Sequence, residues 1–348
     1  MTGVLASTGC AGPGYFMQAT AGHWKLMRQR QDVAEIMADP EADPDLVGRL
    51  ERVMLILGFA EQELGLPPGD NYASYVSTGR DAVVWNVVAT PEFSLTPKKW
   101  CFPVAGCVPY RGYFEEAKAR KAADRLTGKG MDVALTPAAA YSTLGWFRDP
   151  VLDTMLSGSD TQLASILIHE LAHRRLYLKG QTEFSESYAR FVERAGVEKW
   201  LASHGSGNEL AGWQARTRAA AGFNRMLLSA RRELGSLYAA GLPDSELRTA
   251  KVRVLDELRQ VYRETRDRDW AGRDYFRDFM SRDLNNAHLA LLRSYEGGVC
   301  AFAALYEKAN GDFFEFHRLA AERAALDRDA VKAWLARPCA AIAPASDL

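Results

Sequence analysis

The sequence predicts an α+β fold in which helix dominates, and three observations lead to this prediction. Apolar residues recur at spacings of three and four along most of the chain, which is typical of amphipathic helices. Short strand-like runs occur at 83–88, 104–108 and 133–135, with a helical pattern at 115–126 between the last two. With 348 residues, of which 47% are hydrophobic and 25% charged, the chain can bury one large core or two smaller ones.

Helix breakers and periodicity predict the other elements. We expect residues 15 to about 64 to form two or three helices, with breaks near Asp39-Pro40 and Asp43-Pro44. Two apolar stripes flank the turn Gly241-Leu242-Pro243-Asp244 and predict a long αα-hairpin. The stripes are Phe223, Leu227, Leu234 and Leu237 on the first helix and Leu247, Val254, Leu258 and Val261 on the second.

One run combines residue types and spacing that together specify a chemistry: His169-Glu170-Leu171-Ala172-His173. On an α-helix, positions four apart lie on one face, so the imidazoles of His169 and His173 can converge on one ion. Glu170 then lies beside that ion without binding it. Two nitrogen ligands, an open position for water and a carboxylate that accepts the water's proton are the parts of a zinc hydrolase. A chance match on a helix surface is the alternative.

The flanking residues place this run on the first helix of a hairpin. The helix carries an apolar stripe formed by Leu163, Ile166, Leu167, Leu171 and Leu178. Asp160 or Thr161 can cap its start, and we expect it to end near Lys179-Gly180. Thr182 can cap a second helix. Because the loop is short, we expect the two helices to pack antiparallel, so a carboxylate early in the second helix can reach the ion.

Three glutamates are candidates for the third ligand, because Glu183, Glu186 and Glu193 lie near one face of the second helix. The run 185–193, Ser-Glu-Ser-Tyr-Ala-Arg-Phe-Val-Glu, resembles the N-E-G-F-A-x-[YF]-x-E run that carries the third zinc ligand in gluzincin aminopeptidases. This resemblance implies that Glu186 is the ligand and that Glu193 takes the later position beside the ligands. Only twelve residues separate His173 from Glu186, fewer than in well-known gluzincins, so Glu193, after nineteen residues, is the alternative ligand.

Further blocks resemble a bacterial family named "predicted or putative aminopeptidases", in the same order and spacing. The blocks are Gly9-Cys10, 100–107, 110–114, 141–147 and 285–289. The resemblance implies a zinc-dependent peptidase of the bacterial envelope whose substrate is a peptide. Aminopeptidase specificity rests on the family's name alone. Arg174 and Arg175, directly after the motif, are less usual in gluzincins.

The resemblance to zincin-type proteins also implies an architecture. In such proteins, an edge strand of a small sheet upstream of the motif helix pairs with the extended substrate. Residues 138–146 are the candidate for that strand, and a buried turn is the alternative because the segment follows Pro137 and contains Gly145. We expect four regions: a tail at 1–14, a zincin-like catalytic region at 15–205, the helical hairpin at 206–268, and a helical region at 269–348 that packs on the catalytic core.

Two side chains are candidates for stabilising the oxyanion of the tetrahedral intermediate. His288 and Tyr295 are seven residues apart, on one face of an expected helix with Asn285, and either can donate a hydrogen bond. A packing role is the alternative for each. The resulting hypothesis is peptide hydrolysis with Zn²⁺ on His169, His173 and Glu186 and with Glu170 as general base. The competing hypotheses are a non-catalytic envelope lipoprotein with a structural zinc, and a zinc endopeptidase.

The N-terminus suggests a membrane anchor. Residues 5–10, Leu-Ala-Ser-Thr-Gly-Cys, resemble the end of a lipoprotein signal, in which the Cys becomes lipidated. A basic n-region and an apolar h-region do not both fit before Cys10, so either the true start lies upstream or the site is vestigial. The apolar stretches are too short to cross a membrane, so we expect attachment only through Cys10, on the periplasmic side of the envelope. The balance of 43 basic and 44 acidic residues argues against nucleic acid as a partner.

Four cysteines remain if Cys10 carries lipid, an even number that suits an oxidising compartment: Cys101, Cys107, Cys300 and Cys339. Cys101 and Cys107 enclose five residues and are the better disulfide pair. A zinc site on these two thiols is disfavoured, because no second cysteine pair or histidine lies nearby at ligand spacing. Reduced buried thiols are the alternative, especially at Cys300.

Overall fold

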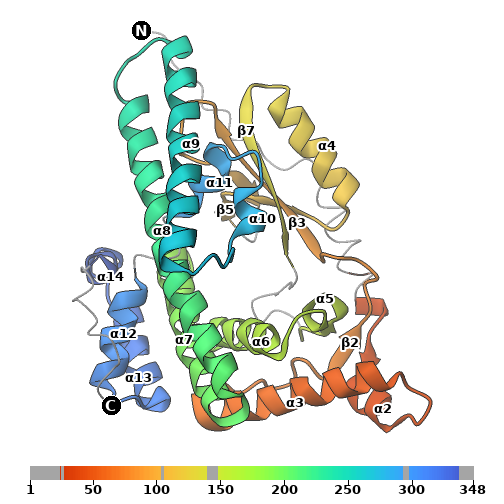
Figure 1. Ribbon diagram of the computed structural model, residues 1–348. Coiled ribbons are helices and arrows are strands. Elements are labelled where there is room, and N and C mark those ends of the chain that lie inside the picture. Colours follow the sequence, from red (N-terminus) through yellow and green to blue (C-terminus); the bar gives the residue numbers. More distant parts are fainter. Residues whose placement is uncertain (1–23, 25–26, 103–105, 139–147, 293–297, 337–348) are drawn as a thin grey trace. The chain divides into compact units, whose positions relative to one another are not determined.

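The helix-dominated α+β fold predicted from the sequence is confirmed by the computed structural model (Figure 1). The structure describes residues 24, 27–102, 106–138, 148–292 and 298–336. Contacts divide the chain into two compact units, each assembled from three separate segments. Unit 1 comprises Met1–Gln29, Thr78–Tyr141 and Ala215–Leu292, and unit 2 comprises Arg30–Ser77, Ser142–Gln214 and Arg293–Leu348. The four consecutive regions expected from the sequence remain predictions.

Unit 1 contains a three-stranded antiparallel sheet in the order β6, β3, β7. The strands are β3 at Val84–Pro91, β6 at Arg111–Tyr113 and β7 at Met131–Ala138. Successive strand residues point to opposite faces, so Val87 packs against α4 (Glu116–Thr127) and Val88 against α11 (Asn286–Ala290). The strands predicted at 83–88 and 133–135 and the helix predicted at 115–126 are therefore confirmed.

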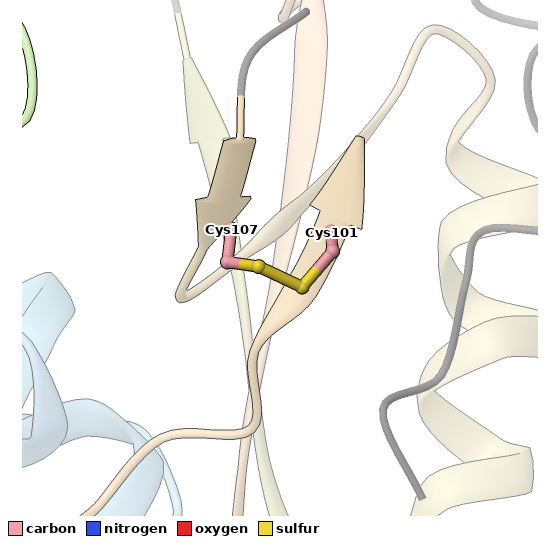
Figure 2. Close-up of a disulfide and its surroundings, with 2 residues drawn as sticks. All are labelled: Cys101 and Cys107. Atoms are coloured by element: carbon pink, nitrogen blue, oxygen red, sulfur yellow. A yellow bond between two sulfur atoms is a disulfide. The ribbon is translucent and has the colours of Figure 1, made fainter. Parts of the chain in front are cut away.

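A two-stranded sheet of unit 1 carries the predicted disulfide. β4 (Trp100–Phe102) pairs antiparallel with β5 (Gly106–Val108), and Cys101 and Cys107 are opposite each other and bonded (Figure 2). Of the strand predicted at 104–108, residues 104 and 105 lie outside the described part. Cys300, in α12 (Val299–Lys308), is also disulfide-bonded, so the alternative of a reduced thiol there is wrong.

The predicted helical hairpin is formed by α8 (Gly207–Tyr238) and α9 (Asp244–Asp269), which lie side by side in Figure 1. Their shared core includes the predicted residues Phe223, Leu227, Leu234, Val254 and Leu258, and α10 (Arg277–Met280) adds Met280. Val261 is wrong as a core residue, because its side chain is 44% exposed. Tyr262 is buried in its place, since it continues the spacing of four from Leu258 on the same helix face.

Unit 2 contains a small sheet and several helices, including both helices that carry the candidate site. β1 (Gln31–Asp32) pairs antiparallel with β2 (Ser74–Val76), which pairs parallel with β8 (Val151–Leu152). Its helices besides α12 are α2 (Val33–Ala38), α3 (Pro44–Leu64), α5 (Asp153–Leu156), α6 (Asp160–Arg175), α7 (Thr182–His204), α13 (Phe313–Ala324) and α14 (Arg328–Leu335). α2 ends before Asp39, and Asp43 caps α3 ahead of Pro44, so both predicted breaks are confirmed.

Some architectural expectations stay open. The strands predicted upstream of the motif belong to unit 1 and α6 belongs to unit 2, so the packing of this helix under that sheet remains a prediction. In the candidate substrate strand at 138–146, only Ala138 is described, and it pairs with Val84 at the end of β7. Within the described ranges, no helix is both long enough and apolar enough to span a bilayer.

Candidate metal centre

The helix that carries the motif begins and ends at different residues from those expected. Ser159, not Asp160 or Thr161, caps α6, because its hydroxyl accepts the Gln162 N–H at 3.3 Å while the Gln162 side chain accepts the Ser159 N–H at 2.9 Å. Asp160 instead forms an ion pair with Arg52 at 2.8 Å. Asp160 is the first residue of α6, so the N-cap position falls to Ser159.

The loop between α6 and α7 also differs in detail. α6 ends at Arg175, four residues before the expected end at Lys179. Thr182 is the first residue of α7 and Gln181 is the N-cap, without a side-chain capping bond. The hydroxyl of Ser185 accepts the Leu178 N–H at 3.0 Å and thereby ties the loop to the first turn of α7. The expected two-helix arrangement is nevertheless present, with a loop of six residues at 176–181.

A glycine allows α7 to approach its neighbours closely. A Cβ atom on Gly196 would lie 2.8 Å from Leu64 Cδ1 of α3 and 3.1 Å from Ile168 Cγ2 of α6. Such distances are shorter than normal van der Waals contact, so a larger residue would require Leu64 and Ile168 to shift. The close packing fixes the face of α6 that carries the two histidines against the face of α7 that carries the glutamates.

His169, His173 and Glu186 form a cluster in which one ligand atom from each lies within 4.8 Å of the others. The two Nε2 atoms are 3.1 Å apart, and the Glu186 oxygens lie 3.6 Å from His173 Nε2 and 3.8 Å from His169 Nε2. Ligands bound tetrahedrally at roughly 2.0–2.1 Å are about 3.3 Å apart. The donor set and its spacing therefore fit a transition-metal ion such as zinc.

Glu193 lies on the other side of His169. Its Oε2 is 3.0 Å from His169 Nδ1, and its Oε1 accepts a hydrogen bond from Ser165 at 2.6 Å. A carboxylate at Nδ1 favours the tautomer with the proton on Nδ1, which leaves the lone pair of Nε2 directed into the cluster. Of the three candidate glutamates, Glu186 lies near Nε2 of His169 and Glu193 near its Nδ1. Glu183 is not part of the three-residue cluster.

The charges in the cluster are mutually dependent. Burial alone would lower the pKa of His169, but the hydrogen bond and charge of Glu193, with the charges of Glu170 and Glu186, raise it. Burial would raise the pKa of Glu186, yet the hydrogen bond and charge of His173 and the charge of His169 lower it. The nearby carboxylates therefore favour a positive charge among them.

One buried atom of the cluster lacks a partner. His173 is 7% exposed, and its Nδ1 makes no hydrogen bond to any residue that the structure describes. Glu170 follows His169 on α6 and is not part of the three-residue cluster. Its charge nonetheless contributes to the raised pKa of His169.

The structure does not test the two oxyanion candidates. His288 lies in unit 1, where Nδ1 accepts the Asn285 N–H at 3.3 Å and burial lowers the pKa of the ring to about 4. α11 ends at Ala290, so the expected single helix through Tyr295 is wrong. Tyr295 itself lies outside the described residues. The oxyanion role remains a prediction for both.

Three neighbours of the cluster were not found from the sequence. Ser165 precedes His169 by four residues on α6, so helical spacing marks it as a neighbour, whereas Tyr177 lies in the loop after the helix. The Tyr177 ring is exposed and packs edge-on against His173 at 6.2 Å. Tyr72 comes from a loop about a hundred residues away and carries no local signal, because only the tertiary fold brings it near Glu170.

Two imidazoles and a carboxylate on packed helices make the chain a candidate metal-binding protein. The family model described as "Putative aminopeptidase" matches residues 14–335, and the chain belongs to this family. Membership suggests peptidase activity. A comparison with curated proteins and one with solved structures gave no match.

Proposed function

We propose that this protein is a zinc-dependent peptidase of the zincin type, with a gluzincin-like ligand set of His169, His173 and Glu186. The observation that carries the proposal is the convergence of both Nε2 atoms and the Glu186 carboxylate. Two imidazoles and one carboxylate are typical of catalytic zinc, in which three protein ligands leave one position open. The family supplies independent support for peptide hydrolysis.

The protein's own residues have separate roles in this mechanism. A zinc ion held there would polarise the substrate carbonyl and lower the pKa of the attacking water. Glu170 accepts the proton of that water and delivers it to the leaving amine. Glu193 orients the His169 ring through Nδ1, and Ser165 holds Glu193 in turn. His288 or Tyr295 donates to the oxyanion.

The geometry favours catalysis over a purely structural zinc. Structural zinc sites usually have four protein ligands, and the cluster among the described residues offers three. A structural site also needs no general base, which is the role proposed for Glu170. A zinc endopeptidase would use the same residues, so cleavage position distinguishes it from an aminopeptidase.

The decisive test combines metal analysis with digestion of a peptide library. Purified protein should hold about one zinc per chain. Glu170→Gln should retain this zinc and lose activity by roughly 10² or more, the scale of a general base. Glu183→Gln is the matched control on α7 and should stay active. An equally active Glu170→Gln variant would refute the mechanism.

The ligand assignment has its own test. Glu186→Gln should lower zinc content sharply, whereas Glu193→Gln should mainly weaken zinc affinity, by roughly 10–100-fold, the usual effect of removing a residue that orients a ligand. If Glu193→Gln empties the site and Glu186→Gln leaves it full, Glu193 is the third ligand instead.

We also propose that the protein works in the cell envelope, on the periplasmic side, anchored through a lipid on Cys10. The disulfide between Cys101 and Cys107 and the bonded state of Cys300 support an oxidising compartment. Expressed from its native gene, the protein should fractionate with membranes, and Cys10→Ser should release it. Recovery of wild type in the cytoplasm with free thiols would contradict this placement.

A further inference from the structure

The α8–α9 hairpin carries a groove of about 860 Å³, whose lining residues all belong to unit 1. Two stripes with spacings of three and four residues line it, one on each helix. Such spacing keeps a stripe on one helix face and is typical of helices that pack against further helices. The stripes include Ala219, Gly222 and Met226 on α8 and Leu258, Val261 and Thr265 on α9.

Val261 leaves apolar surface exposed in this groove. It continues the apolar stripe of α9, yet its side chain is 44% exposed. The next residue, Tyr262, packs its ring against Phe223 at a centroid distance of 5.6 Å. Val261 and Gly222 therefore lie at about the same level on the two sides of the groove. An exposed valine on α9 is thus level with a residue on α8 that has no side chain.

The charged side chains of the lining differ in sign between the two helices. Arg218 and Arg225 line the groove on α8, whereas Glu257 and Asp269 line it on α9. Both arginines are exposed, and neither forms an ion pair with a residue that the structure describes. A Cβ atom on Gly222 would lie 3.8 Å from Arg225 Nη2, so the Arg225 guanidinium lies over the groove.

The acidic side chains of α9 have only weak partners of their own. Glu257 is 3.7 Å from Arg253, and Asp269 pairs with Arg268 at 2.7 Å. Both pairs are exposed to solvent, and such pairs contribute little to stability, so they can be exchanged for other partners. Glu233, nearer to the turn, is the acidic residue that lines the groove on α8.

A second copy of this chain would match both the shape and the charges of the groove. In Figure 1, α8 and α9 lie side by side. A two-fold axis parallel to the hairpin places α9 of the copy on α8 at the same level. Val261 of the copy then faces Gly222. Arg225 and Glu257 lie three and four residues nearer to the turn than Gly222 and Val261, so Arg225 faces Glu257 of the copy.

We propose that the α8–α9 groove is the interface of a homodimer in which two hairpins form a four-helix bundle. Helix α8 of each copy packs on α9 of the other, so each contact occurs twice. The lining holds as many acidic as basic side chains, which favours a self-complementary partner over a strongly charged one. These residues are Arg218, Arg225, Glu233, Glu257, Asp269 and Arg273. The interface does not depend on the proposed zinc chemistry.

Sedimentation velocity of the full chain tests the interface, with Cys10→Ser present throughout to exclude association through a lipid. This protein should form a dimer at micromolar concentrations. Val261→Arg should raise the dissociation constant at least about tenfold, because the groove has no room for a second charged side chain at Gly222. Val252→Arg, at an exposed valine of α9 that does not line the groove, is the matched control and should remain dimeric.

Charge reversal distinguishes contacts between copies from contacts within one chain. Arg225→Glu and Glu257→Arg should each weaken the dimer at least about tenfold, because like charges then meet twice. An equimolar mixture of these two single variants should restore the dimer, since every Arg225–Glu257 contact between unlike copies again joins opposite charges. A contact within one chain cannot be restored by mixing.

The remaining outcomes overturn the proposal. A monomer before any change in the groove would leave the groove to a partner of another kind. A dimer that withstands Val261→Arg and both charge reversals would use a different surface. Single variants that stay monomeric when mixed, while circular dichroism shows both to be folded, would remove the pairing of Arg225 with Glu257 of a second copy.

Discussion

The α6–α7 and α8–α9 helix pairs are both hairpins, yet their interfaces differ in composition. The α8–α9 interface is apolar and aromatic, with Phe223, Leu234 and Leu258 in one continuous core. The α6–α7 interface combines apolar packing at Ile168 with a polar cluster around His169. Buried carboxylates and imidazoles weaken a core unless a cation compensates them. The difference suggests that α8–α9 serves stability and that α6–α7 gives up some stability for its site.

The largest expected effect is in the apolar hairpin. Leu234 is fully buried, so Leu234→Ala should lower the free energy of unfolding by about 2–5 kcal/mol, because it removes apolar burial and leaves a cavity. Denaturant unfolding measures this change, and zinc content should not alter. Val252→Ala, at an exposed position of α9, should change stability by less than about 0.5 kcal/mol. Loss of zinc in Leu234→Ala would show that the two hairpins are not independent.

The next effect concerns His317 of α13, which forms a hydrogen bond with Tyr188 of α7. His317 Nε2 donates to the Leu64 carbonyl at 2.7 Å and Nδ1 accepts from the Tyr188 hydroxyl at 2.8 Å, so both nitrogens are satisfied in the neutral ring. Burial lowers the pKa of His317 to about 4. An unfolded histidine titrates near 6.5, so the unfolded chain binds the extra proton between these values. The contribution of neutral His317 to the free energy of unfolding is fully present above about pH 6.5 and is lost as the pH falls toward 4.

Chelator-treated wild type and His317→Gln should therefore differ in pH dependence. Unfolding by urea between pH 4 and 7 should show a steeper loss of stability in wild type, by an amount on the order of 3 kcal/mol. Chelation removes the contribution of metal binding to the same pH range. Parallel curves for the two proteins would mean that His317 is not held neutral by the fold.

A smaller effect tests the close approach of α7. Gly196→Ala should destabilise the protein by about 1–3 kcal/mol, because the added methyl group would overlap Leu64 and Ile168. Gly58→Ala on α3 is the matched control, since nothing lies within 4 Å of its Cβ position. It should instead stabilise by up to about 1 kcal/mol through helix propensity. Thermal unfolding measures both changes in stability. Equal changes for Gly196→Ala and Gly58→Ala would show that close packing does not require glycine at position 196.

The smallest effect lies within the polar hairpin itself. Ser165→Ala removes the hydrogen bond to Glu193 and should weaken zinc affinity about tenfold in chelator competition, through looser orientation of His169. Ser203→Ala, which removes a bond to the backbone of α7 near its end, should leave affinity unchanged. Unchanged zinc affinity in Ser165→Ala would show that Glu193 orients His169 without help from Ser165.

Sequence periodicity predicted the elements that depend on local spacing, such as the hairpin at Gly241 and the helix of His169. The Cys101–Cys107 disulfide was also predictable, because a short loop brings its ends together. Features set by distant contacts were not predictable. The ion pair of Asp160 with Arg52, for example, joins residues that lie about a hundred positions apart.

The segmented composition of unit 2 has a consequence for the order of synthesis. Tyr188 on α7 packs against Phe316 and His317 of α13, which leave the ribosome more than a hundred residues later. Until then, α3 and α6 can pack against α7, but the side that carries Tyr188 lacks its contacts with α13. His169 to Glu193, by contrast, emerge almost together. All residues of the candidate metal cluster are therefore synthesised before α13, and the apolar side of α7 around Tyr188 is exposed in the incomplete chain.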